Sequence, residues 1–188
     1  MERIKKMKQR RRREGFTDYR KRLALLKSGM LRVIIRKTNR RIIAQIAKYS
    51  EGGDIILKGV TSDMLKAYNW PARANKPTAY LTGLLLANVA GSLKGENFII
   101  DAGLASFGRN SIGAAFAKGF IDGGMKLSAT LSIDEKAYNC DWLIAYAKSL
   151  MESDPERYKR QFSTYIKDGT LENLKARFEE VKSKLLAG

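Results

Sequence analysis

Hydrophobic residues recur with two spacings along this chain, and the change between them predicts an α/β fold. Leu31 to Lys37 and Arg40 to Tyr49 alternate apolar and polar positions, which predicts two strands joined by a turn at Thr38-Asn39. Asp54 to Val60 and Phe98 to Asp101 predict two further strands.

Between and after these strands the spacing becomes that of helices. Thr17 to Lys27 predicts a helix that Thr17 caps. A short helix starts at Thr61-Ser62-Asp63, and a long one runs from Thr78 to about Ala90. A further helical pattern consists of Ile112, Phe116 and Phe120. The order β-β-β-α-α-β predicts a mixed sheet with helices packed on it.

From residue 131 onward the pattern is that of amphipathic helices. Asp134 can open a helix that carries Tyr138, Trp142 and Tyr146. Asp154-Pro155 is typical of a second helix start. The last helix, which Thr170 can cap, has the apolar stripe Leu171, Leu174, Phe178, Val181 and Leu185. This tail either lies back on the domain or docks on a protein neighbour, and the pattern is compatible with both.

The hairpin has two different faces if Lys37 faces Arg40 across the turn. One face is apolar and pairs Leu31, Val33 and Ile35 with Ile46, Ala44 and Ile42. The opposite face gathers Arg32, Arg36 and Arg41 beside Gln45, without matching acids. We expect phosphates to supply the counter-charges, because the guanidinium fork fits phosphate oxygens. An ordinary half-exposed hairpin is the alternative.

The net charge of +17 is concentrated at one end of the chain. Residues 1–48 hold 18 Lys and Arg against three acids, and residues 49–188 hold 18 against 16. Such a block repels itself unless a polyanion neutralises it, so RNA is the expected partner. Met1 to Arg13 alone carries eight basic residues. We interpret it as an arm that orders on its partner; a solvated tail or a localisation signal is the alternative.

Several classes of function are disfavoured by what the sequence lacks. It contains no histidine and a single cysteine, Cys140, whose neighbour Asp141 should raise its pKa. Neither a zinc site nor a thiolate nucleophile is therefore expected. Glycines at 103–108 and 119–124 have the spacing of a phosphate-binding loop, but no Lys-Ser or Lys-Thr follows. Asp54 and Asp101 alone are a weak signal for carboxylate-metal catalysis. We expect no catalysis, metal, cofactor or small-molecule substrate.

The chain also offers no apolar run long enough to span a membrane and no apolar stretch after its basic start that would indicate a signal peptide. The basic arm holds only three apolar residues, too few for a peripheral membrane anchor. One cysteine suits a reducing compartment. We therefore expect a cytoplasmic protein.

Several segments, in order along the chain, resemble a known family. They are residues 17–29, 33–45, 79–85, 99–104 and 116–124. Together they closely resemble the archaeal form of the large-subunit ribosomal protein that binds 5S ribosomal RNA, the eighteenth of the large subunit in bacterial counting. The long C-terminal addition is similar to that of archaeal and eukaryotic members. One departure is Met30-Leu31, where relatives commonly have a proline before the first strand.

The resemblance implies a three-layer α/β domain of ribonuclease-H-like type, with helices on both faces of the sheet and no catalysis. It implies that the protein binds 5S rRNA, attaches it to the large-subunit rRNA in the central protuberance of the ribosome and lies near a second 5S-binding ribosomal protein. We divide the chain into a basic arm (1–15), an α/β RNA-binding domain (16–130) and a helical extension (131–188).

The expected RNA-binding residues combine the arm, the first helix and the hairpin. Phosphate contacts are expected from the cationic members of the set, and base stacking or hydrogen bonding from Tyr19, Thr38, Asn39, Gln45 and Trp70. Trp70, next to Pro71, can equally close the core. The full set is Arg10, Arg11, Arg12, Arg13, Tyr19, Arg20, Arg22, Arg32, Arg36, Lys37, Thr38, Asn39, Arg40, Arg41, Gln45 and Trp70. A free-standing RNA chaperone or a subunit of a modifying enzyme, acting on many RNAs, is the alternative function.

Overall fold

A five-stranded mixed sheet forms the centre of the protein. The computed structural model describes residues 7–8, 10–105, 107–129, 133–167, 169, 171 and 173–187. The strand order is β3-β2-β1-β4-β5, with β1, β2 and β3 antiparallel and β1, β4 and β5 parallel. The strands are β1 Leu31–Lys37, β2 Ile42–Lys48, β3 Ile55–Thr61, β4 Asn97–Asp101 and β5 Lys126–Leu127. This confirms the predicted α/β class; the ribonuclease-H-like type stays a prediction.

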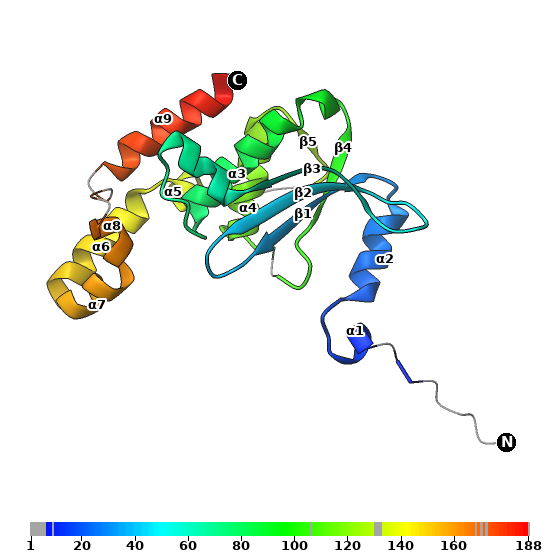
Figure 1. The fold of residues 1–188 in the computed structure, drawn as a ribbon, viewed down its shortest axis with the longest axis horizontal. Helices are drawn as coiled ribbons and strands as arrows, with labels where there is room; N and C mark the ends of the chain where they lie inside the picture. Colours follow the sequence, from blue (N-terminus) through cyan, green and yellow to red (C-terminus); the bar gives the residue numbers. More distant parts are fainter. Residues whose placement is uncertain are drawn as a thin grey trace.

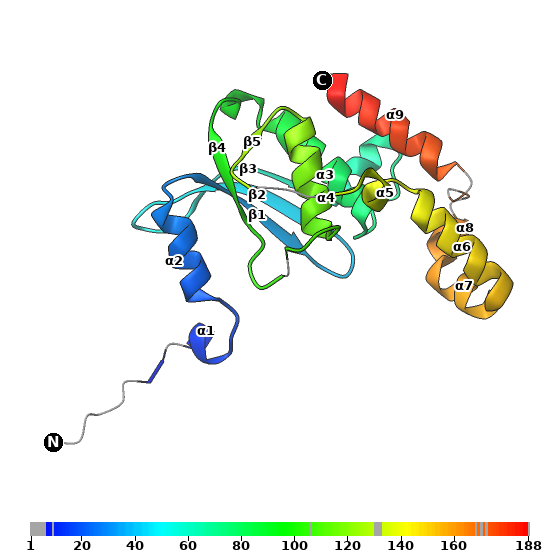
Figure 2. The ribbon, with the colours of Figure 1, turned by 180° about the vertical axis from the view of Figure 1, so that it is seen from behind.

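Helices flank the sheet and extend the chain at both ends. The α-helices are α1 Arg10–Arg13, α2 Tyr19–Lys27, α3 Lys76–Val89, α4 Ile112–Asp122, α5 Glu135–Tyr138, α6 Asp141–Ser153, α7 Pro155–Gln161, α8 Ser163–Lys167 and α9 Leu174–Ala187. Two 3-10 helices are η1 Ser62–Tyr68 and η2 Gly91–Leu93. Figures 1 and 2 show α3 and α4 on one face of the sheet, with α1–α2 and α6–α8 at opposite ends of the molecule.

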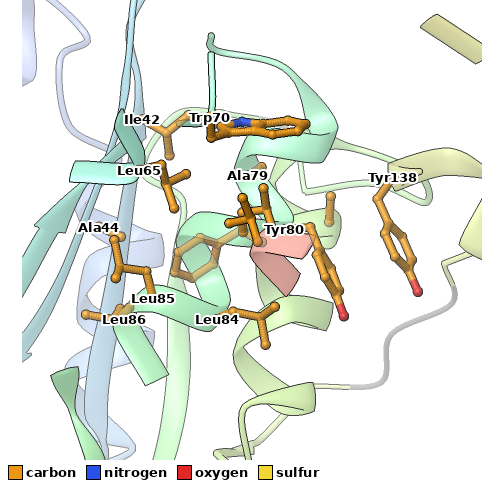
Figure 3. Packing of buried hydrophobic residues seen from close by; sticks show 14 of the residues in the cluster. Ile42, Ala44, Leu65, Trp70, Ala79, Tyr80, Leu84, Leu85, Leu86 and Tyr138 are labelled. Carbon is orange, nitrogen blue, oxygen red and sulfur yellow. The ribbon is translucent and has the colours of Figure 1, made fainter. Parts of the chain in front are cut away.

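The core lies between the sheet and α3. This helix is buried on nearly every side because the sheet, α4 and α9 surround it. Asn75 caps it by accepting a hydrogen bond from the Thr78 amide at 3.0 Å. A side chain at Gly83 or Gly119 would collide with the backbone of the other helix, so these glycines permit α3 and α4 to cross closely. Figure 3 shows Leu85 and Leu86 of α3 near Ala44 of β2, and the Tyr80 ring beside that of Tyr138, on which it stacks at 4.5 Å between centroids.

The predicted faces of the two strands are correct except for Arg41, which lies in the connecting loop, but the register is wrong. Ile35 pairs with Ala44 and Val33 with Ile46, a shift of two residues from the predicted pairing. The connection is therefore a four-residue loop, residues 38–41, and not a two-residue turn. The Thr38 hydroxyl closes this loop, since it accepts from the Arg41 amide at 3.0 Å and donates to the Arg41 carbonyl at 2.9 Å.

Other helix boundaries also differ from expectation. The side chain that caps α2 is that of Asp18, not Thr17. The helix predicted from Asp134 through Tyr146 is interrupted at Asn139, which is extended, so that α5 and α6 are separate. Asp154 caps α7 as predicted. The predicted cap at Thr170 lies outside the described residues.

The C-terminal helix α9 packs back on the domain. Its buried side chains are Leu174, Phe178, Val181 and Leu185, four of the five residues of the predicted stripe. The Phe178 ring meets Trp70 edge-on at 5.8 Å between centroids and lies 5.7 Å from Tyr80. Of the two alternatives for the tail, the structure therefore shows α9 lying on α3, in the same hydrophobic core as the sheet.

Candidate nucleic-acid interface

A buried arginine organises the sheet face opposite to α3 and α4. Arg32 of β1 has a side chain only 1% exposed, and its guanidinium is paired with two carboxylates. One belongs to Asp54, in the turn before β3. The other belongs to Asp101, at the end of β4, whose Oδ2 lies 3.4 Å from Nη1 of Arg32. A buried cation without partners is strongly unfavourable, so these two acids permit Arg32 to occupy the sheet.

The same two acids also hold arginines that are closer to solvent. Arg22 of α2 donates to Asp54 at 3.0 Å, and Arg36 of β1 donates to Asp101 at 3.1 Å. Burial alone would raise the pKa of Asp54, but the hydrogen bond and charge of Arg32, together with Arg22, lower it below its ordinary value. We call these five residues the Arg32 network. It ties α2, β1, β4 and the turn before β3 together.

The prediction that the hairpin arginines lack matching acids is therefore wrong. Arg32 and Arg36 are paired as described, and Arg41 lies 3.6 Å from Asp63 of η1. Arg41 also lies in the loop and not on the sheet face, because of the shifted register. The acids come from other segments, so the hairpin sequence alone does not reveal them. Burial removes Arg32 from the surface that an RNA can reach.

The hairpin tip, residues 37–41, is exposed and strongly cationic. Lys37, Asn39 and Arg40 are all exposed. Among the ion pairs of the described residues, none involves Lys37 or Arg40. The Thr38 hydroxyl is already bonded within the loop, so it holds the shape of the tip. The tip thus presents free positive charge on a fixed scaffold.

A concave surface, which we call the α2 hollow, lies between α2, the end of β1 and the turn after β4. Its cationic lining consists of Arg11, Lys21, Arg22, Arg36 and Lys37. Its acids, Asp18 and Asp101, are engaged within the chain: the first caps α2, and the second belongs to the Arg32 network. Arg22 and Arg36 are also paired within that network, so the excess positive charge of the hollow comes from Arg11, Lys21 and Lys37.

The described part of the predicted arm consists of residues 7–8 and 10–15 and includes α1. Its four arginines, Arg10 to Arg13, form a single helical turn and are all exposed. Arg10 pairs with Glu14 at 2.8 Å across one turn, an exposed contact that contributes little. Residues 1–6 and 9 of the predicted arm lie outside the described residues. Ordering of the arm on a partner stays a prediction.

A comparison with protein families identifies the family to which this chain belongs. Residues 3–95, which are 93 of the 188 residues, match the family model described as "Ribosomal large subunit proteins 60S L5, and 50S L18". The chain belongs to this family. It is a ribosomal protein of the large subunit, and rRNA binding is consistent with this membership. The match covers the elements from α1 to η2 and thus includes the hairpin tip and most of the α2 hollow.

Trp70 does not belong to this ribosomal protein's exposed surface. Its side chain is 2% exposed, its Nε1–H donates to the Thr78 hydroxyl at 2.9 Å, and its ring packs against Phe178. Of the two roles considered for it, closing the core is confirmed. We remove Trp70, like Arg32, from the set of candidate RNA contacts.

The remaining predicted residues lie at the surface. Tyr19 is 38% exposed at the start of α2, and Arg20 is exposed beside it. Gln45 is half-buried on the open sheet face. Lys21 was not in the predicted set, yet its Nζ donates to the Gly103 carbonyl at 3.2 Å across the α2 hollow. Its position between Arg20 and Arg22, which both belong to the predicted set, could have indicated Lys21 from the sequence.

The described residues offer little support for metal binding, catalysis or a membrane span. No three His, Cys, Asp or Glu side chains gather there as a potential metal site. Asp54 and Asp101, considered as catalytic carboxylates, both hold arginines. Burial, with a smaller contribution from Asp141, raises the pKa of the Cys140 thiol to about 12, so the expected direction of the Asp141 effect is confirmed. None of the helices that the structure describes combines the length and the apolar character needed to cross a membrane.

Proposed function

We propose that this ribosomal protein binds 5S rRNA and attaches it to the large-subunit rRNA in the central protuberance of the cytoplasmic ribosome. The observation that carries the proposal is the hairpin tip, where Lys37 and Arg40 expose charge that no described acid pairs with. Family membership supports an rRNA partner. The choice of 5S rRNA, and of a neighbouring 5S-binding ribosomal protein as second partner, rests on the resemblance of the sequence segments described above.

The interface divides into residues that supply affinity and residues that supply specificity. The arm, the α2 hollow and the tip neutralise phosphates, and each contact contributes about −0.7 to −0.9 to the slope of log affinity against log salt. Tyr19, Asn39 and Gln45 offer a ring and amide groups to unpaired bases. The role is structural, without catalysis, metal or cofactor.

The test is a competition between 5S rRNA and transfer RNA of similar size, at moderate and high salt. We expect a strong preference for 5S rRNA. Deletion of residues 1–13 should weaken binding without abolishing the preference, because the tip and the α2 hollow remain. Replacing Lys37 and Arg40 by Gln should weaken binding about tenfold and reduce the salt slope by about 1.5.

Equal affinity for the two RNAs would contradict the proposal and favour the chaperone alternative. So would a Lys37→Gln/Arg40→Gln variant that binds 5S rRNA as well as the unchanged protein does. The matched control is the pair Arg157→Gln and Arg160→Gln on α7, exposed residues at the opposite end of the molecule from α2 (Figure 1).

A further inference from the structure

A second cationic groove lies on the other side of the hairpin tip from the α2 hollow. We call it the α9 groove. Its walls come from three distant parts of the sequence: Arg40 and Arg41 of the tip, residues 63–73 of η1 and the following loop, and Arg177 of α9. The match to the ribosomal family ends at residue 95, so α9 lies outside it.

The charge of the α9 groove is positive after internal pairing. Five cationic side chains line it, namely Arg40, Arg41, Lys66, Arg73 and Arg177, against two acids, Asp63 and Glu180. Asp63 is occupied by Lys66 at 3.0 Å and Arg41 at 3.6 Å. Glu180 pairs with Lys184, outside the groove.

Arg73 and Arg177 are the two free cations that matter most. Among the ion pairs found within the described ranges, neither forms one. Arg73 is exposed, and Arg177 is half-buried, so its position is restricted. Glu180 lies one turn from Arg177, and the charge of Arg177 contributes to lowering its pKa after the larger effects of Lys184. One carboxylate beside several guanidinium groups leaves an excess of positive charge.

The groove is held in shape by the hydrophobic core beneath it. Trp70 forms its floor, fixed by the hydrogen bond to Thr78 and by edge-on packing against Phe178. Because Phe178 follows Arg177 in α9, the same contact that buries Phe178 places Arg177 at the groove. Preorganised cations lose little conformational entropy on binding, which favours a fixed ligand site.

The groove and the α2 hollow meet at the hairpin tip. Lys37 lines the hollow and Arg40 lines the groove, and both belong to the hairpin tip. Tyr68 adds a half-buried ring to the groove, a surface on which a base can stack. A chain of phosphates that crosses the tip would therefore find cations on both sides.

We infer that the α9 groove is a second RNA-binding site, which takes a single-stranded phosphodiester backbone with Arg73 and Arg177 as phosphate ligands. The inference rests on the proposed function and extends it, because it assigns RNA contact to the C-terminal part of the chain. The bound strand belongs either to 5S rRNA or to the large-subunit rRNA. Both present the same phosphate chemistry.

The experiment measures binding of the full chain to 5S rRNA and, separately, to a large-subunit rRNA transcript, over a series of salt concentrations. We expect the Arg73→Gln/Arg177→Gln variant to bind at least one of these RNAs about tenfold more weakly, with a salt slope reduced by about 1.5. The RNA that loses affinity is the source of the bound strand. The Arg73→Lys/Arg177→Lys variant should recover most of the slope, because it keeps the charge.

Two controls separate this inference from a fold defect and from the proposed function. Circular dichroism and thermal unfolding should show that the Gln variant is folded, since both arginines lie at the surface of the groove. The Arg157→Gln/Arg160→Gln variant should change neither affinity nor slope. Unchanged binding of the groove variant to both RNAs, or an equal loss in the control, would overturn the inference.

The proposed function fails under a different result, namely equal binding of the unchanged protein to 5S rRNA and transfer RNA. If the groove variant nevertheless loses affinity in that case, the groove is an RNA site on a protein without 5S preference. If the tip variant loses affinity for 5S rRNA and the groove variant loses affinity for neither RNA, only the present inference is wrong.

Discussion

Arg32 and Arg40 belong to the same hairpin and have the same side chain, yet their settings are opposite. Arg32 is 1% exposed and shares Asp54 and Asp101 with two other arginines. Arg40 is exposed at the tip and forms no ion pair with any described residue. One arginine is part of the framework, and the other is available to a ligand.

The difference shows that an arginine-rich hairpin is not uniformly a binding surface. The decisive quantity is the supply of acids from the rest of the fold. Two carboxylates reach Arg32 and Arg36 of β1, and none of the described ones reaches Lys37 or Arg40. Mutations should therefore divide into those that change stability and those that change RNA affinity.

The largest effect is expected from Arg32→Leu. Removing this cation leaves Asp54 and Asp101 partly buried with one partner fewer each, so the free energy of unfolding should fall by about 3 to 5 kcal/mol. Urea denaturation followed by circular dichroism measures this change. The folded variant should bind 5S rRNA like the unchanged protein. Normal stability with lost affinity would reverse the assignment of Arg32 to the framework.

A smaller effect, on affinity alone, is expected from Arg41→Glu at the tip. Its control is Lys175→Glu on α9, because each residue is exposed and has one acidic neighbour, Asp63 for Arg41 and Asp141 for Lys175. Arg41→Glu should weaken 5S rRNA binding about tenfold, and Lys175→Glu less than about twofold. Filter binding at moderate salt distinguishes them. Equal losses would mean that total charge, and not a localised site, determines affinity.

Arg36→Gln sharpens the comparison because Arg36 lies between the two settings. Its side chain is 46% exposed and still donates to Asp101. We expect a loss of about 1 kcal/mol in the free energy of unfolding, together with an affinity reduced about threefold. Both quantities are measured on one preparation. A change in only one of them would place Arg36 fully in the framework or fully in the interface.

The smallest effect is a dependence on pH. Because the pKa of Asp54 in the folded protein lies below its ordinary value of 3.8, its ionised form stabilises the fold above that pH. This stabilisation is lost as the pH falls through the folded pKa. In Asp54→Asn, the decrease in unfolding free energy from about pH 4 to about pH 2 should be smaller than in the unchanged protein. Equal slopes in the two proteins would show that Asp54 does not contribute.

The sequence by itself determined the types and order of the main elements and the side of each that faces the core. The alternation of faces along β1 and β2 selects Val33, Ile35 and Ala44 for the interior, and the structure buries all three. Hydrophobic burial depends only on which face a residue occupies, so local periodicity is sufficient to predict it. The concentration of charge in residues 1–48 was equally visible from the sequence.

Periodicity could not predict the register of the hairpin. Side chains alternate with a period of two, so a shift of two residues leaves every residue on the same face and the hydrophobic pattern unchanged. The hydrogen bonds of Thr38 within the loop accompany the observed pairing of Val33 with Ile46.

Only the tertiary structure decided which cations remain free. Asp54 and Asp101 reach Arg32 because β1 lies beside β4 and close to the turn before β3. Arg177 lines the α9 groove because Phe178, the next residue, packs against Trp70. These contacts join residues far apart in the sequence. Two charges pair only if the fold brings them close in space, whereas an apolar side chain is driven out of water by its own chemistry. The sequence therefore predicted the core, and the fold selected the candidate binding surface.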